Sequence, residues 1–256
     1  MLKRDILKSR KDYGVTLAEV LITLGIIGIV AAMTIPTLIE KYKITTLHAS
    51  FNKTYAVIQQ ALKITLDDIG FEKPSDVSIY YDTNNEKIEQ NFGEINKIWE
   101  TQFNGASKVK SSTFNFKRLF NDFWGAPSRI YGDTHEYYYL LPDGSLISDI
   151  GYNKRYGGVV ALDIFFDTNG LYKGPNRIGY DQFYFYNDGE TTPYQGDVDY
   201  LVDCDPFRTK SPNGYWDKFT QAACSSYALK NINPYDSSKK YWDSLYKPQS
   251  WWKKLK

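Results

Sequence analysis

The chain lacks most of the sequence features that accompany enzyme chemistry. It has no glycine-rich phosphate-binding loop, no G-x-S-x-G nucleophile motif and no H-E-x-x-H metalloprotease motif. Its only histidines are His48 and His135, so any histidine-based triad would have to use one of them. Composition alone permits a glycosidase-type carboxylate pair, but no motif points to one. The sequence therefore predicts a protein that is not an enzyme.

The chain has little net charge, and one long stretch of it has no charged side chain. The formal net charge is +1, which leaves no electrostatic footprint for a nucleic-acid partner. Locally, no charged side chain occurs from Val20 to Ile39. A helix of that length, at about 1.5 Å per residue, spans roughly 30 Å, the thickness of a bilayer's hydrocarbon core. We therefore predict a membrane-spanning helix.

Cysteine is also scarce, because only Cys204 and Cys224 occur, late in the chain and with 19 residues between them. Outside the cytoplasm such a pair is expected to oxidise, and closing a loop of that size stabilises by about 3 kcal/mol in the chain-entropy model. Zinc would need more ligands than two widely spaced thiols provide. We favour a disulfide, with buried free thiols as the alternative.

One carboxylate, that of Glu19, lies within the apolar block that begins after Gly14. A carboxylate in lipid costs on the order of 2–3 kcal/mol and rarely occurs there without a partner. A cut after Gly14 would give Val15 a free α-amino group, a cation able to pair with Glu19 of a neighbouring subunit. The alternatives are a secretory signal peptide, whose apolar region is shorter at about 7–15 residues, and a plain signal anchor. A plain anchor leaves Glu19 unexplained.

The order of Gly14, an apolar residue, Thr-Leu, Glu19 and an apolar helix resembles the processing and methylation motif of type IV prepilins and type II secretion pseudopilins. The similarity covers about residues 1–40, and Val15 stands where the family most often has phenylalanine. The resemblance implies that a prepilin peptidase cleaves between Gly14 and Val15 and methylates the new amine of Val15. It also implies that Glu19 guides assembly into a helical filament.

The expected organisation has three parts. Residues 1–14 are a basic leader that stays in the cytoplasm by the positive-inside rule. Residues 15–70 form the N-terminal pilin helix, transmembrane over 15–39 and kinked at Pro36, which lacks an amide donor. Residues 71–256 form an extracytoplasmic globular head.

Periodic patterns predict the elements of the head. Apolar residues recur every three or four positions after the membrane span, at Leu47, Phe51, Tyr55, Ile58, Leu62, Leu66 and Ile69. We expect this stripe to pack on the protein's own sheet, with a partner helix as the alternative, and Gly70 to cap the helix. The other expected elements are a strand at Val77–Tyr81, a helix over 86–100, a hairpin of Glu136–Leu141 and Ser145–Ile150, and strands at Val159–Phe166 and Gln182–Tyr186.

Gly105–Ser112 and the region beyond residue 190 are predicted to be loops, whereas the aromatic-rich stretch Phe114–Trp124 fits either a helix or a strand. Aromatic residues make up 16% of the chain and favour strands. Tyrosines at Tyr137–Tyr139, Tyr184 and Tyr186 allow a sugar-binding face, although alternating strand aromatics more often serve packing. The predicted fold is α+β and pilin-like: a long N-terminal membrane-spanning helix packed on an antiparallel β-sheet head with a disulfide-closed C-terminal region.

One loop carries a candidate metal site. Asp167, Asn169, Asn176 and Asp181 offer the oxygen ligands that calcium prefers. The loop is not an EF-hand, because the twelfth position from Asp167 is Ile178 rather than glutamate. It looks like a segment in the globular part of some prepilin-type proteins, and some pseudopilins bind calcium in a comparable loop. The alternative is that these residues are turn formers whose side chains cap local backbone.

The resemblance implies a structural subunit of a type II secretion pseudopilus or a related type IV pilus-like filament, anchored by a single pass in the bacterial inner membrane with a cytoplasmic N-terminus. The implied partners are the prepilin peptidase, other pilin or pseudopilin subunits, the inner-membrane assembly platform and membrane lipid. No nucleic acid is expected in the secretion hypothesis, and calcium is the only cofactor suggested. The alternatives are a surface pilus subunit for adhesion or DNA uptake and a signal-anchored binding ectodomain.

Overall fold

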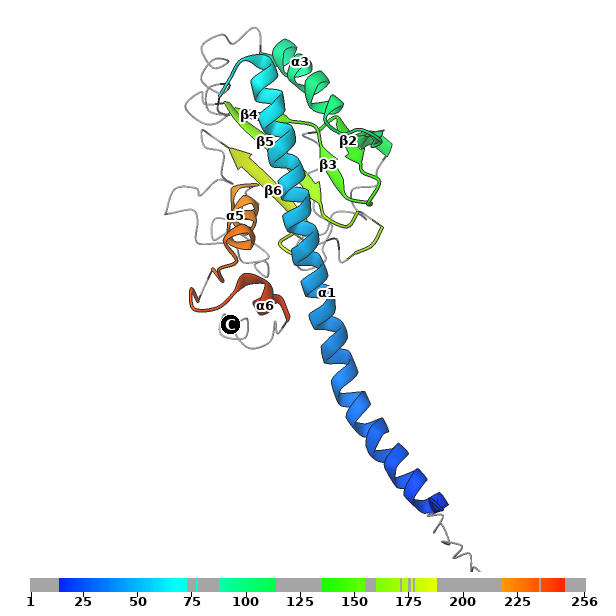
Figure 1. Ribbon diagram of the computed structural model, residues 1–256. Helices are drawn as coiled ribbons and strands as arrows, with labels where there is room; N and C mark the ends of the chain where they lie inside the picture. Colours follow the sequence, from blue (N-terminus) through cyan, green and yellow to red (C-terminus); the bar gives the residue numbers. More distant parts are fainter. Residues whose placement is uncertain are drawn as a thin grey trace, which may run out of the picture. The chain divides into compact units, whose positions relative to one another are not determined.

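The computed structural model describes residues 14–72, 77, 88–113, 135–154, 160–170, 172–174, 176, 178–187, 218–234 and 236–246. Its elements in chain order are α1 (Leu17–Ile69), α3 (Ile88–Thr101), β1 (Ser107–Lys110), the 3-10 turn η1 (Ser111–Thr113), β2 (Tyr137–Leu140), β3 (Leu146–Ser148), β4 (Gly151–Lys154), β5 (Val160–Asp167), β6 (Gln182–Asn187), α5 (Lys218–Lys230) and α6 (Tyr241–Tyr246) (Figure 1). The chain divides into an N-terminal unit, Met1–Lys43, and a head unit, Ile44–Lys256.

Helix α1 ends as its sequence predicts. Gly70 has a φ of 81°, a left-handed conformation that suits a residue without a Cβ. The amide of Phe71 donates to the carbonyl of Leu66 at 2.9 Å, and the amide of Gly70 donates to the carbonyl of Asp67 at 3.2 Å. This pair of hydrogen bonds is the Schellman arrangement, which satisfies carbonyls that have no partner inside the helix. The predicted C-cap is confirmed.

The described strands form one antiparallel sheet in the order β1-β2-β3-β5-β4, with β6 paired to the other edge of β5. The predicted hairpin is confirmed, since Tyr139 pairs with Ile147 across β2 and β3. The predicted strands over residues 159–166 and 182–186 are confirmed as β5 and β6. The expectation of a loop over 105–112 is wrong for residues 107–110, which form β1 against β2. Strand β4 was not predicted.

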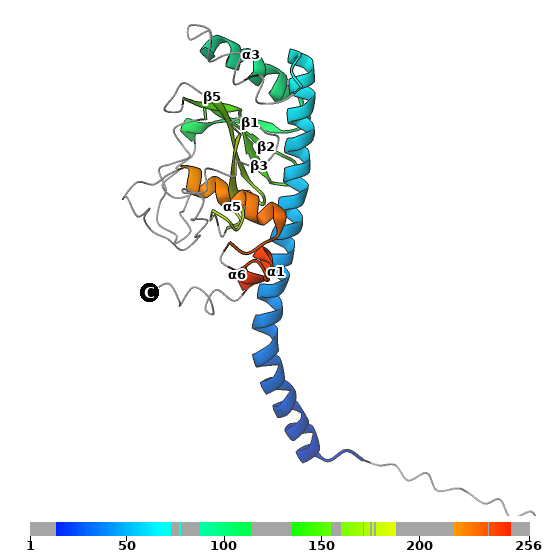
Figure 2. The same ribbon diagram turned by 90° about the vertical axis from the view of Figure 1, so that its left-hand side faces the viewer.

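One face of the sheet packs on the part of α1 that belongs to the head unit (Figure 2). The ring of Phe51 meets that of Phe183 at a centroid distance of 4.5 Å, and the ring of Tyr55 meets that of Phe185 at 5.3 Å. The helix side chains in this core include Leu47, Phe51, Ile58, Leu62 and Leu66, all buried. The predicted stripe therefore packs on the protein's own sheet, as expected.

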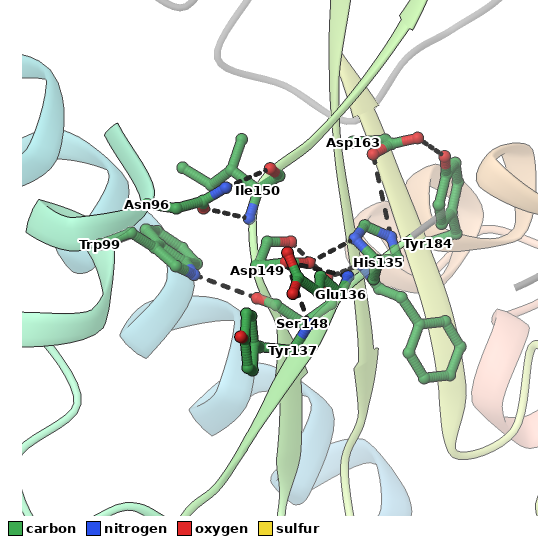
Figure 3. Close-up of polar contacts among 11 residues, drawn as sticks. Asn96, Trp99, His135, Glu136, Tyr137, Ser148, Asp149, Ile150, Asp163 and Tyr184 are labelled. Atoms are coloured by element: carbon green, nitrogen blue, oxygen red, sulfur yellow. Dashed lines mark hydrogen bonds and ion pairs between the residues drawn. The ribbon is translucent and has the colours of Figure 1, made fainter. Parts of the chain in front are cut away.

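Strands β3 and β4 form one interrupted strand along β5. Ile147 pairs with Phe166 and Gly151 with Asp163, so four steps on one side match three on β5, and one residue is extra. Such a bulge leaves backbone groups without ladder partners. Helix α3 supplies them: the side-chain amide of Asn96 bonds both the amide and the carbonyl of Ile150 (Figure 3). The expected second helix is confirmed as α3.

The expectation of loop throughout the region beyond residue 190 is wrong, because α5 and α6 lie there. Helix α5 runs along the outer edge of β6, where Ser225 Oγ accepts from the amide of Tyr184 at 3.2 Å and donates to its carbonyl at 2.8 Å. On α6, the ring of Trp242 stacks on His48 of α1 at 5.0 Å. Of the strand expected at Val77–Tyr81, only Val77 is described, as a buried helical residue.

Candidate functional site

The N-terminal unit carries its apolar side chains on the outside. Val15 and Leu17 are 73% and 77% exposed, and the first buried residue along α1 is Leu47. Its apolar stretch reaches a mean hydropathy of 2.2 over 18 residues, none of them buried, and it is the one helix in the described part of the chain long and apolar enough to cross a membrane. A surface of this kind needs lipid or other chains around it.

Thr16 and Glu19 form a reciprocal cap at the start of this helix. Glu19 Oε2 accepts from the backbone amide of Thr16 and from its hydroxyl, both at 2.8 Å. The amide of Glu19 in turn donates to Thr16 Oγ1 at 3.3 Å. This is a capping box, in which a threonine and a glutamate three residues later satisfy amides at the helix start. Sequence reasoning missed the role of Thr16, although the spacing T-x-x-E signals it.

The capping box occupies only one of the two carboxylate oxygens of Glu19. Both contacts with Thr16 use Oε2, and no described residue donates to Oε1. Val15, the residue before the cap, is exposed together with Gly14, and both precede the first helical residue. The peptide bond between Gly14 and Val15 is therefore open to another molecule, next to a carboxylate with an unused oxygen. Cleavage, methylation and assembly at these residues stay predictions.

Pro36 lies inside α1, as expected. Its ring removes one backbone donor, and the helix continues beyond it to Ile69. Nearby, the hydroxyl of Thr34 donates to the carbonyl of Val30 at 2.9 Å. The kink at Pro36 and the boundaries at residues 14, 39 and 70 stay predictions.

The proposed calcium ligands lie in a loop held by its own hydrogen bonds. Asp167 is fully buried; its Oδ1 accepts from the amides of Asn169 at 3.1 Å and Gly170 at 2.7 Å, and its Oδ2 accepts from Gln182 Nε2 at 3.0 Å. Asp181 Oδ2 accepts from the amide of Asn176 at 2.8 Å. These contacts match the turn-forming alternative, in which the side chains cap local backbone.

Burial raises the pKa of Asp167 to about 6, against the opposing effect of its three hydrogen bonds. Within the described residues, no three histidine, cysteine, aspartate or glutamate side chains gather as metal ligands do. A calcium ion would have to replace hydrogen bonds that Asp167 already makes. Calcium binding by Asp167, Asn169, Asn176 and Asp181 stays a prediction.

Two other expectations concern the head unit. Cys224 is buried on α5, whereas Cys204 lies outside the described residues, so their disulfide stays a prediction. Of the tyrosines considered for a sugar-binding face, Tyr138, Tyr139 and Tyr184 are buried and serve packing, Tyr137 is half-buried, and the side chain of Tyr186 lies outside the described part of the structure. Packing was the alternative that the sequence favoured.

Comparison with known proteins gives one match. The prokaryotic N-terminal methylation motif matches residues 9–35, which include Gly14, Val15 and Glu19. No curated protein and no solved structure matches the chain. This is the motif of prepilin-type cleavage and methylation. The chain therefore carries a prepilin-type cleavage and methylation motif at the start of a long apolar helix, and an antiparallel sheet follows that helix.

Proposed function

We propose that this protein is a non-enzymatic structural subunit of a type II secretion pseudopilus or a related type IV pilus-like filament. The carrying observation is the arrangement at the start of α1, where the methylation motif contains an exposed Gly14–Val15 bond and, four positions after Val15, Glu19, which keeps one oxygen unused among the described residues. The helix behind it exposes apolar side chains that its own chain does not cover. Both features suit a part that is completed by other subunits.

Assembly follows from charge and solvation. In the membrane, Glu19 is held by Thr16, which supplies two donors and lowers the cost of an acid in lipid. After cleavage, the amine of Val15 is a cation at the same depth. Pairing this amine with Glu19 Oε1 of an adjacent subunit satisfies both groups, whereas removing one partner would leave an uncompensated charge in an apolar filament core.

The proposal also specifies the partners of the protein and its location. A prepilin peptidase cuts and methylates, other pilin or pseudopilin subunits supply the amines, and an assembly platform in the bacterial inner membrane extracts the helix from lipid. The basic leader stays in the cytoplasm and the head unit lies on the other side. Calcium is the proposed ligand of the loop containing Asp167.

Substitution of Glu19 tests this function. Glu19→Gln keeps the size of the side chain and an oxygen for Thr16 to donate to, but it removes the charge. We expect this variant to insert in the membrane normally and to be lost from filaments. The measurement is immunoblotting of sheared filaments and of the membrane fraction, in cells that make the native protein. Intact-mass analysis of the native protein should show a chain that begins at a methylated Val15.

The matched control is Glu40→Gln, the same change at the far end of the apolar run, which should assemble normally. Normal assembly of Glu19→Gln would contradict the pairing, and a native protein that retains residues 1–14 would contradict the processing. Two further observations separate the machines: long external fibres labelled on the head unit indicate a surface pilus, whereas loss of protein export on deletion indicates a pseudopilus.

A further inference from the structure

A polar cluster lies inside the sheet of the head unit, away from the N-terminal site. It consists of His135, just before β2, Asp149 in the break between β3 and β4, Asp163 on β5, and Tyr184 on β6 (Figure 3). We call it the His135 cluster. Asp163 and Tyr184 are fully buried, and His135 and Asp149 are nearly so. In the described part of the chain no lysine or arginine pairs with either carboxylate.

Most polar atoms of the cluster have partners. Asp149 Oδ2 accepts from the amides of Glu136 and Tyr137, both at 3.1 Å, and Asp149 Oδ1 lies 2.9 Å from His135 Nδ1. The hydroxyl of Tyr184 donates to Asp163 Oδ2. Nδ1 of the imidazole must therefore carry a proton, because Asp149 already accepts two amides as a carboxylate.

Two buried atoms remain, and they face each other. His135 Nε2 lies 3.8 Å from Asp163 Oδ1, and neither has a hydrogen-bond partner in the described structure. An unprotonated ring nitrogen and a carboxylate oxygen are both acceptors, so without a proton they repel and both stay unsatisfied. One proton between them converts the pair into donor and acceptor. It also lowers the net charge of a buried cluster from −2 to −1, which burial favours.

The backbone around the pair keeps it close. Gly151 pairs with Asp163 in the register, and a Cβ at Gly151 would collide with Asp163 Oδ1 and press on the ring of His135. The absence of that side chain is what lets the carboxylate approach the imidazole. The bulge between β3 and β4 has a matching effect on Asp149, because the extra residue brings its carboxylate to the amides of Glu136 and Tyr137 at the start of β2.

We propose that the folded head unit holds one proton between His135 Nε2 and Asp163 Oδ1, so that folding takes up one proton and the fold weakens as the pH rises above neutrality. In the unfolded chain between pH 7 and 9, the carboxylates are charged and histidine is mostly neutral. The folded state then binds one proton more than the unfolded state. By linkage, the folding equilibrium constant falls about tenfold for each pH unit, or about 1.4 kcal/mol.

Among the described residues, the groups around the cluster are these. From β2, the ring of Tyr138 lies 6.0 Å from that of His135, and from β6 comes Tyr184, both phenols. The side chain of Glu136 is exposed and pairs with Lys110. Elsewhere, Asp167 has its pKa at about 6 and the pKa of His48 is lowered, so both titrate below the window. Burial raises the pKa of Tyr139 and Tyr241 above their ordinary value of 10.

The test is the pH dependence of unfolding of the full-length protein in detergent micelles, followed by tryptophan fluorescence in a denaturant titration. The wild type should lose about tenfold in folding constant per unit from pH 7 to 9. Asp163→Asn should abolish most of this slope, because its amide donates to a neutral Nε2 while its carbonyl accepts from Tyr184. The control is Asp236→Asn, the same change at an exposed residue outside the cluster, which should keep the slope.

A flat wild-type profile, or an unchanged slope in Asp163→Asn, would overturn the proposal. If Asp163→Asn does not fold, a second measurement still tests the proposal. The chain has two histidines, so ¹⁵N-histidine labelling of the His48→Gln variant isolates His135. Its Nε2 resonance should show a proton in slow exchange at pH 8, and its absence would overturn the proposal. If stability rises with pH and falls when EDTA is added, a divalent cation rather than a proton lies between His135 Nε2 and Asp163 Oδ1. That result would also overturn the proposal.

Discussion

Two side chains on the same helix show how differently the two units are built. Leu17 of the N-terminal unit is 77% exposed, whereas Phe51 of the head unit is fully buried. Both are apolar residues in regular α-helix, so helix propensity does not separate them. What differs is whether the chain itself supplies a cover. The head unit covers its apolar stripe with its own sheet, whereas the described residues leave the apolar surface of the N-terminal unit exposed.

The carboxylates differ in the same way. Glu19 is exposed and takes its partners from Thr16, three residues away, with one oxygen left over. Asp149 and Asp163 are buried and take partners from several strands. The first arrangement allows exchange with another molecule at little cost, whereas the second is closed to other molecules. The contrast supports the proposal that the N-terminal unit is the part that acts on partners.

The substitution Phe51→Ala tests the contrast between the two units most directly. Phe51→Ala removes a ring that contacts Phe183, Phe166 and Trp242, and we expect it to lower the free energy of unfolding of the head unit by about 3–5 kcal/mol. Denaturant titration followed by tryptophan fluorescence measures this. The matched control is Ile27→Ala, on the exposed part of α1, which should leave head stability unchanged. Equal losses in the two variants would show that the helix stabilises the fold by propensity alone.

The comparison between exposed and buried carboxylates can be tested through the pH dependence of stability that Asp167 causes. Its pKa in the folded state is about 6, above the ordinary value of 3.8, so the folded state holds the proton more tightly than the unfolded state. Stability from this group is therefore present below pH 4 and lost as the pH rises through 6. Relative to Asp167→Asn, the wild type should lose up to about 3 kcal/mol between pH 4 and 7. Thermal unfolding across this range in EDTA gives the difference.

The same pair of proteins tests calcium. Calcium binding would favour the charged form of Asp167, so millimolar calcium should raise the melting temperature of the wild type at pH 7 and leave Asp167→Asn unchanged. An identical melting temperature with and without calcium would remove the metal from this loop. The pH profile in EDTA would stand in either case, because it depends on the burial and hydrogen bonds of Asp167 and not on a bound metal.

Much of this organisation was predictable from sequence. The apolar stripe, the Gly70 cap and the β2–β3 hairpin follow local rules of spacing and turn chemistry. Helix α5 was missed because the residues it buries, such as Cys224 and Ala228, are small and give little apolar periodicity. Strand β1 was missed because Lys108 and Lys110 make it look like a loop, although lysines are common on edge strands.

The N-terminal site could be read almost entirely from sequence, since its residues lie within a few positions of each other. The His135 cluster could not be, because its members come from four segments of the chain separated by up to 49 positions, from His135 to Tyr184. No spacing rule connects them. Only the register of the sheet, and the bulge that shifts it, place the histidine between two aspartates.

The smallest effect is expected at the ion pair between Lys53 on α1 and Asp143 in the β2–β3 turn. Its atoms lie 2.7 Å apart, but the lysine side chain is 63% exposed, so water and salt screen the attraction. Lys53→Met keeps the packing of the aliphatic stem and should change the free energy of unfolding by less than about 1 kcal/mol. Asp143 stays satisfied in the variant, because it also accepts from the amide and hydroxyl of Ser145. Denaturant titrations at low and high salt measure the effect. A loss of more than about 2 kcal/mol in the free energy of unfolding would mean that this surface ion pair contributes substantially to the stability of the head unit.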